Sequence, residues 1–156
     1  SGLIGENPLS APTSLIPVIT KSAIGIIPPM HVHGTDYETR DGSCIRDYIH
    51  VSDLAEAHIL SLKKLFKKES EGNYETINLG TGNGISVLEA IKAFELASGE
   101  KLNYKSGPRR PGDVESIYSD TTLSEKLLNW KPKYDLNTML STAWQWELNL
   151  KKRTSE

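Results

Sequence analysis

The chain has 156 residues, 37% of them hydrophobic and 24% charged, which is enough for one globular domain with a core of its own. Its formal net charge of −2 gives no overall attraction to nucleic acid or to an anionic membrane, and no apolar run reaches membrane-spanning length. The single cysteine, Cys44, excludes an internal disulfide and a Cys-rich zinc site, and it suits a reducing, cytoplasmic location.

Helix and strand patterns alternate through the first half of the chain. The predicted elements are a helix from about Ser14 to Gly25, a strand at Met30–His33, a strand at Ile45–Val51 and a helix from about Leu54 to Lys67. Pro17 is accommodated because it falls in the first turn of its helix. Asp53 or Ser52 is expected to cap the second helix.

The second half of the chain continues this alternation. The predicted elements are a strand at Tyr74–Gly80, a helix that ends near Ser98, a strand at Lys101–Gly107, a helix at about Thr122–Leu128 and a longer helix from about Asp135 to Leu150. Ser86 with Glu89 three residues later predicts a capping box at the start of the first of these helices. The alternation predicts an α/β fold in which part of the sheet is parallel.

The glycine-rich segment "NLGTGNGIS" invites comparison with a dinucleotide-binding fingerprint. Its spacing does not match, because after Gly80 and Gly82 the third glycine would fall at position 85, which is Ile85. Glu100 follows a helix stop, whereas the acidic residue that binds ribose belongs at the end of a strand. We therefore expect a turn that leads into a capped helix, not the cofactor site.

Two histidines, His31 and His33, lie two residues apart on a predicted strand and are expected to face the same way. A metal site would need further ligands at suitable spacing, and none is evident, so packed or solvated histidines are expected. The sequence contains none of the common nucleophile, zinc-protease or P-loop motifs.

The segment "GPRRPGD" (107–113) places two arginines between prolines. Because successive side chains of an extended segment point in opposite directions, Arg109 and Arg110 should not share one target. Arg46 with one of them is suited to a phosphate or diphosphate, and Asp113 to a ribose hydroxyl. The alternative is that Asp47 and Asp113 simply pair with the neighbouring arginines at the surface, and residue chemistry alone does not choose between the two.

The motifs "GENP", "SLIP", "DGSCIRDYIHVSDLA", "INLGTGNGISVLEAI", "PRRPGD" and "LNWKPKYDL" occur in this order along nearly the whole chain. Together they resemble the C-terminal part of UDP-glucose 4-epimerases, in the extended short-chain dehydrogenase/reductase family. The resemblance implies that residues 1–156 form one UDP-sugar-binding domain, with elements such as "INLG" and the helix after Asp53 completing a Rossmann half. That family inverts C4 of the sugar by way of NAD and a Tyr-x-x-x-Lys pair, and this sequence contains neither that pair nor the NAD fingerprint.

By this resemblance, Arg46 and Arg110 are diphosphate ligands and Asp113 is a ribose ligand. The segment His31–His33 matches the place where backbone groups of the family meet uracil. No catalytic, NAD-binding or metal-binding residue is expected in this chain, so NAD and catalysis would belong to a longer protein.

Two positions depart from the pattern of that family. Ser14 and Leu15 match a helix start that contacts the phosphates, but the family often has asparagine where this chain has Ser14. Ile117 stands where some members have a tyrosine that narrows the sugar pocket. The smaller side chain suggests the hypothesis that N-acetylated UDP-sugars also fit.

The chain lacks an initiator Met and begins in a turn-rich stretch, so we expect it to be the interior of a longer protein. Its expected partners are a UDP-sugar, an N-terminal NAD-binding Rossmann domain and a second copy in a homodimer. The alternatives are another nucleotide-sugar enzyme, such as a dehydratase or decarboxylase, and a non-catalytic nucleotide-binding module. A tyrosine and lysine pair upstream would separate the enzymes from the module.

Overall fold

The computed structural model describes residues 2–67 and 74–154. Within them the chain order is α1 (Leu15–Ala23), β1 (Met30–His33), β2 (Ile45–Arg46), α2 (Val51–Phe66), β3 (Ile85–Ser86), α3 (Val87–Ser98), β4 (Tyr104–Gly107), α4 (Thr122–Leu128) and α5 (Leu136–Thr154). This mixture confirms the predicted α/β class. Among the described residues, no helix is both long and apolar enough to cross a membrane.

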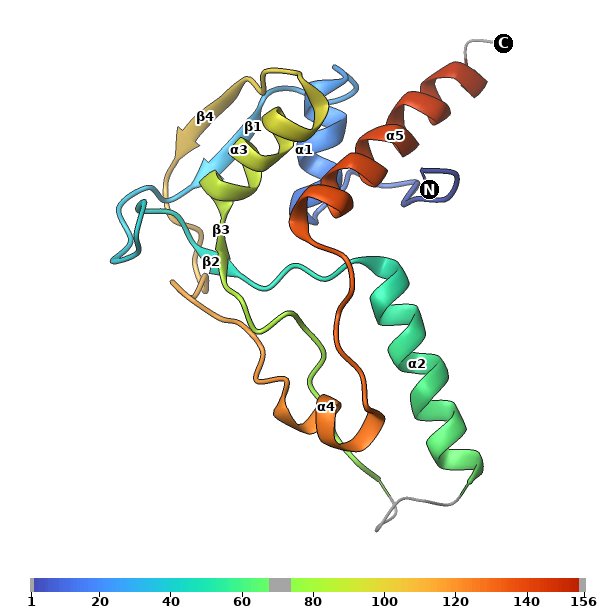
Figure 1. Ribbon diagram of the computed structural model, residues 1–156. Coiled ribbons are helices and arrows are strands. Elements are labelled where there is room, and N and C mark those ends of the chain that lie inside the picture. The colour runs from blue at the N-terminus through green and yellow to red at the C-terminus, as the bar shows by residue number, and fades with distance from the viewer. Residues whose placement is uncertain (1, 68–73, 155–156) are drawn as a thin grey trace.

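The strands form two small sheets. β1 and β4 pair in parallel, in register from Met30 opposite Tyr104 to His33 opposite Gly107, which confirms the predicted parallel pairing. β2 and β3 pair antiparallel, with Ile45 opposite Ser86. In Figure 1 the β1–β4 pair lies with α1, α3 and α5 in the upper part of the molecule, while α2 and α4 lie below β2 and β3.

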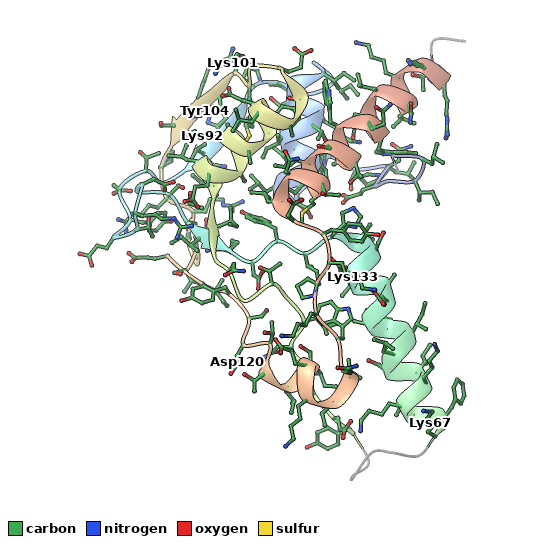
Figure 2. The ribbon with its side chains drawn as sticks, viewed as in Figure 1. Lys67, Lys92, Lys101, Tyr104, Asp120 and Lys133 are labelled. Atoms are coloured by element: carbon green, nitrogen blue, oxygen red, sulfur yellow. The ribbon has the colours of Figure 1, made fainter. Side chains whose placement is uncertain are left out.

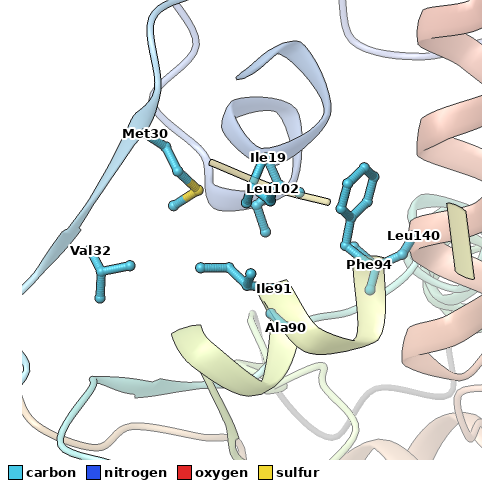
Figure 3. Close-up of a cluster of buried hydrophobic side chains, with 8 residues drawn as sticks. All are labelled: Ile19, Met30, Val32, Ala90, Ile91, Phe94, Leu102 and Leu140. Carbon is cyan, nitrogen blue, oxygen red and sulfur yellow. The ribbon is translucent and has the colours of Figure 1, made fainter. Parts of the chain in front are cut away.

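The main hydrophobic core fills the space between the β1–β4 pair and the helices α1, α3 and α5. Its eight buried residues, shown in Figure 3, are Ile19, Met30, Val32, Ala90, Ile91, Phe94, Leu102 and Leu140. Phe94 of α3 meets Trp144 of α5 edge to face, with ring centroids 5.5 Å apart. Each large buried apolar side chain contributes about 1.5–3 kcal/mol, so this cluster is the principal source of stability in the upper part.

A smaller core joins α2 and α4 in the lower part. Ala57, Leu128 and Trp130 form it, and Trp130 is only 2% exposed. Lys133 lies beside α2 in Figure 2, and its Nζ is 2.6 Å from Glu56 Oε1. The two cores are separate clusters, with β2 and β3 between them in Figure 1.

Local helix signals predict most helix positions correctly. The capping box at Ser86 and Glu89 is present, and Gly99 ends α3 in a left-handed conformation with φ of 75°. α5 is longer than predicted and continues to Thr154, because the basic side chains of its last turn favour the negative end of the helix dipole.

The predicted cap of α2 is wrong. This helix begins at Val51, and its N-cap is His50, whose Nδ1 accepts a hydrogen bond from Ser52 N at 3.0 Å. Asp53 is not available as the cap, because its carboxylate accepts the N–H groups of Lys133 and Tyr134, each at 3.1 Å. The acid thus ties the first turn of α2 to the chain that leads into α5.

Two predicted strands are also wrong in extent. The expected strand at Ile45–Val51 is reduced to Ile45–Arg46, and no regular strand is present at residues 74–80 in the described part of the chain. Alternating side chains predict an extended backbone, but a strand also needs a neighbouring backbone. Ile77 and Leu79 instead pack onto the core around Trp130. Likewise the strand predicted from Lys101 begins only at Tyr104, near the upper end of β4 in Figure 2.

Candidate functional site

The two arginines of the "GPRRPGD" loop diverge, as predicted. Arg109 Nε donates to Asp36 Oδ1 at 2.9 Å, and its guanidinium lies 4.2 Å from the centre of the Tyr37 ring. Its hydrogen bond to Asp36 raises the pKa of Arg109 above its ordinary value. Arg110 turns instead to Asp113, with Nε 3.0 Å from Oδ2. Arg109 therefore anchors the loop, and Arg110 faces the candidate site.

Arg46 reaches the same aspartate from β2. Its Nη2 lies 3.6 Å from Asp113 Oδ1, and its Nη1 donates to the carbonyl oxygens of Ile45 and Val114 at 2.8 and 2.7 Å. Asp113 thus lies between two guanidinium groups that are 64 residues apart in sequence, at positions 46 and 110. Its side chain is only 18% exposed, so the pairing is partly shielded from solvent.

Ile117 belongs to the same segment as Asp113. This segment is held to β2 by two backbone hydrogen bonds, Ile45 N to Glu115 O at 2.8 Å and Ile117 N to Ile45 O at 3.1 Å. The side chain of Ile117 is 55% exposed. The structure therefore brings Arg46, Arg110 and Asp113 into contact and fixes Ile117 beside β2, four residues after Asp113.

Asp47 does not pair with an arginine, so this part of the ion-pair alternative is wrong. Its carboxylate accepts the backbone N–H groups of Thr81, Gly82 and Ser119 at 2.9, 3.1 and 3.2 Å, and the Thr81 hydroxyl at 2.5 Å. Burial alone would raise the pKa of Asp47, but these hydrogen bonds outweigh burial and hold it below its ordinary value. For Asp113 the alternative does describe the contacts, since both arginines touch it.

The glycine-rich segment is shaped around this carboxylate. A Cβ at Gly80 would collide with Asp47 Oδ2 and with the Ser119 hydroxyl. Gly82 has φ of 71°, a left-handed conformation that glycine adopts without strain. Because Asp47 takes the N–H groups of Thr81 and Gly82, this loop does not fit the pyrophosphate of NAD. The prediction of a turn leading to a capped helix is confirmed.

His31 and His33 face the same side of β1, and their ring centroids are 6.1 Å apart. A Cβ at Gly107 would lie 3.4 Å from His31 Nδ1 and 3.6 Å from His33 Nδ1, so the rings flank the residue that begins the arginine loop. In the described ranges, no group of His, Cys, Asp or Glu residues is suited to a metal ion.

Ser14 and Leu15 lie at the start of α1. Ser14 is the N-cap, but its hydroxyl makes no capping hydrogen bond, and Leu15 packs against the main core. Among the described residues, no hydrogen bond or ion pair joins either residue to the arginines or to Asp113.

Sequence reasoning missed the residues that hold the arginines and β2 in place. Asp36 and Tyr37 fix Arg109 through a hydrogen bond and a ring contact. Burial raises the pKa of the Tyr37 hydroxyl above its ordinary value. The only sequence signal for the role of Asp47 is indirect: glycines at alternate positions from Gly80 indicate a close approach by another group, but not which group.

The described part of the chain is thus an α/β fold in which two arginines contact one aspartate, and comparison with known proteins shows its family. The chain belongs to the family described as GDP-mannose 4,6 dehydratase, whose model matches residues 6–143.

Within this family the similar proteins are UDP-glucose 4-epimerases, which confirms the resemblance predicted from the motifs. The bifunctional UDP-glucose 4-epimerase and UDP-xylose 4-epimerase 1 of Pisum sativum is 51% identical over 149 residues, covering 96% of this chain and 42% of the pea protein. UDP-glucose 4-epimerase 2 of Oryza sativa subsp. japonica is 50% identical over 146 residues, covering 94% of this chain and 36% of the rice protein.

Solved structures show the same partial match. The UDP-glucose 4-epimerase of Stenotrophomonas maltophila, with bound NAD and formylated UDP-arabinopyranose, superposes with a TM-score of 0.91 at 42% identity, over 97% of this chain and 44% of that one. The Bifidobacterium longum enzyme, in complex with NAD+ and UDP, gives a TM-score of 0.88 at 40% identity, over 95% and 43% of the two chains. The chain thus spans less than half the length of these relatives.

Proposed function

We propose that the chain is the UDP-sugar-binding part of a UDP-glucose 4-epimerase that interconverts UDP-glucose and UDP-galactose by way of NAD. The observation that carries the proposal is the arrangement of Arg46 and Arg110 on either side of Asp113. Two guanidinium groups held this way present planar donors to a diphosphate, which an exposed lysine does not. The chain would bind substrate and leave the redox step to the rest of the protein.

The N–H groups that Arg46 and Arg110 leave available support a diphosphate between the two arginines. Each guanidinium has five N–H groups. Nε of Arg46 and Nη1 of Arg110 make no hydrogen bond within the described part of the chain, while the other nitrogens hold Asp113 and backbone carbonyls. An anion that bridges the two groups therefore gains charge-assisted hydrogen bonds without breaking those that orient the arginines.

The proposal assigns the remaining predicted ligands to other parts of the nucleotide. Asp113 has acceptor capacity beyond its two arginine contacts, so it can also accept from a ribose hydroxyl. In the described residues β1 pairs on one edge only, with β4, which leaves backbone groups of His31–His33 for a base such as uracil. Ser14 and Leu15 would approach the phosphates from the start of α1.

Titration of the chain with UDP by calorimetry tests the site. Arg46→Ala and Arg110→Ala should each weaken binding by about tenfold to a hundredfold, the value of a hydrogen bond to a charged group. Arg153→Ala is the matched control, because it removes the same charge from the last turn of α5. Unchanged affinity in the Arg110→Ala variant would show that the site assignment is wrong.

A partner for the lower part of the molecule belongs to the same proposal. α2 exposes an apolar stripe at i, i+8, i+11 and i+15, formed by Val51, Ile59, Leu62 and Phe66, and Phe66 is 83% exposed. Single exposed apolar residues are common, but a stripe along one helix indicates a contact surface. We propose that this stripe packs against the NAD-binding Rossmann domain of the longer protein. The longer protein itself would form a cytoplasmic homodimer.

Sedimentation of the isolated chain tests this surface. The wild-type chain should self-associate as its concentration rises, and Phe66→Lys should shift it toward the monomer. A control, Tyr104→Lys, changes an exposed aromatic residue on β4, away from α2 (Figure 2). A wild-type chain that remains a stable monomer at all concentrations would contradict the proposed contact.

The family description favours one alternative, a nucleotide-sugar dehydratase. The two activities differ in product: an epimerase returns a sugar of the same mass, whereas a dehydratase removes water. Mass spectrometry of the longer protein with UDP-glucose and NAD decides between them, and a product lighter by one water molecule would refute the epimerase.

A further inference from the structure

One carboxylate, that of Asp47, joins three segments of the chain at the candidate site. It directly follows Arg46 at the end of β2. Oδ1 accepts from the hydroxyl and N–H of Thr81, and Oδ2 accepts from the N–H groups of Gly82 and Ser119. The side chain therefore fixes β2 to the glycine-rich loop and to the chain that follows Ile117.

The residues on both sides of Arg46 form hydrogen bonds with the segment that carries Asp113 and Ile117. On one side, Ile45 exchanges backbone hydrogen bonds with Glu115 and Ile117. On the other side, Asp47 accepts the N–H of Ser119 at 3.2 Å. The segment that carries Asp113 and Ile117 is thus attached to β2 at two points, with Arg46 between them.

The charge of Asp47 suits this role better than an amide would. Successive side chains of an extended segment alternate in direction, so Arg46 points to Asp113 while Asp47 points to the glycine-rich loop. Four N–H or O–H donors converge on Asp47, and hydrogen bonds to a charged acceptor are stronger than neutral ones. Asparagine would aim its own N–H2 group at some of these donors.

We propose that Asp47 is a positioning residue: its carboxylate sets the spacing between Arg46 and the segment Asp113–Ile117, and so the geometry in which the site takes a nucleoside diphosphate. The proposal rests on the proposed function, because it concerns the same site. The Asp47 carboxylate is occupied by donors of the chain itself, so in this proposal it acts through Arg46 and the segment that Ser119 anchors.

The test compares Asp47→Asn with Asp41→Asn. Asp41 is a matched control, because its carboxylate also accepts a backbone N–H, from Ser43 at 3.0 Å, and hydroxyls of Ser43 and Ser86, but it does not contact the 113–119 segment. Three quantities are measured: UDP affinity by calorimetry, hydrogen exchange of a peptide covering 113–119, and the NMR signal of the Arg46 Nε–H group.

The Asp47→Asn variant should bind UDP at least about tenfold more weakly, the cost of one charge-assisted hydrogen bond. It should also exchange faster over 113–119 and shift the Arg46 signal, while Asp41→Asn leaves all three near wild type. Unchanged affinity in Asp47→Asn, or equal loss in both variants, would overturn the proposal. If Asp47→Asn does not fold, Thr81→Val removes one donor to Asp47 and should weaken UDP binding in the same direction, and an unchanged affinity would again refute it.

Failure of the proposed function has a different signature. In that case the wild-type chain does not bind UDP, and the exchange and NMR measurements still decide the role of Asp47. Faster exchange over 113–119 together with a shifted Arg46 signal, only in Asp47→Asn, supports the positioning role. No change in either measurement refutes it.

Discussion

Replacement of Asp53 by alanine should destabilise the chain strongly, although Asp53 is not one of the candidate site residues. Asp53 is completely buried, and its two oxygens accept the backbone N–H groups of Lys133 and Tyr134, each at 3.1 Å. Alanine would leave both N–H groups without their acceptor. The first turn of α2 would then lose its connection to the chain that leads into α5.

The magnitude follows from these two hydrogen bonds. A bond to a charged acceptor contributes about 1.5–3 kcal/mol, so two coupled bonds correspond to about 3–5 kcal/mol. This is a large share of the roughly 5–15 kcal/mol that stabilises a typical domain. For a chain of this size the expected fall in Tm is about 6–20 °C.

Calorimetry with tryptophan fluorescence measures the effect, because buried Trp130 lies in the small core that α2 shares with α4. The control is Asp120→Ala, an exposed aspartate before α4 (Figure 2) that accepts one N–H, from Thr122 at 2.9 Å. It should change Tm little. If Asp53→Ala lowers Tm no more than this control, the reasoning from buried hydrogen bonds is refuted.

Three further predictions concern other sites. Burial raises the pKa of Glu147, so the folded chain keeps a proton that the unfolded chain releases. The free energy of unfolding should therefore fall as pH rises above 4.5, the ordinary pKa of this carboxyl group. Unfolding measurements across pH should show that Glu147→Gln removes this fall. Gly80→Ala should lower Tm and weaken UDP binding because its Cβ would collide with Asp47, whereas Gly25→Ala meets no atom within 4 Å and should cost only the strain of its left-handed backbone. In the longer enzyme, Ile117→Tyr should reduce kcat/KM for UDP-N-acetylglucosamine but not for UDP-glucose. The hypothesis would be contradicted if neither the wild type nor the variant acts on UDP-N-acetylglucosamine.

Features of the fold that depend on neighbouring residues were predictable from sequence. The capping box of α3 needs only Ser86 and Glu89 three residues apart, and the short strand at Met30–His33 needs only its apolar alternation between prolines and glycine. The divergence of Arg109 and Arg110 follows from the geometry of any extended segment. In each case the physical cause lies within a few residues.

Features that depend on distant groups were not predictable in the same way. Asp47 stands beside Arg46 in sequence, which favours an ion pair, yet its acceptor capacity is taken by donors at positions 81, 82 and 119. His50 caps α2 because Asp53 is occupied by the chain near Lys133. The local sequence predicts that a polar side chain bonds to its nearest partner. In the folded chain, backbone N–H groups from distant segments take the place of that partner.

Three aspartates, at positions 41, 47 and 53, join segments of the chain that are distant in sequence. Asp41 accepts the Ser86 hydroxyl at the start of α3, Asp47 accepts the N–H groups of the glycine-rich loop, and Asp53 accepts N–H groups ahead of α5. The main core and the core around Trp130 do not share residues, and Asp53 connects α2, which carries Ala57 of the smaller core, to the chain that leads into α5, which carries Leu140 of the main core.

Carboxylates that accept backbone N–H groups fix direction and distance, whereas hydrophobic contacts are non-directional. The candidate site lies along this same stretch, with Arg46 between Asp41 and Asp53 in the chain and next to Asp47. A site that must hold two guanidinium groups at the spacing of a diphosphate needs directional support of this kind. Arg46 is next to Asp47, whose carboxylate joins β2 to the glycine-rich loop and to Ser119, and this carboxylate would give the proposed anion site that support.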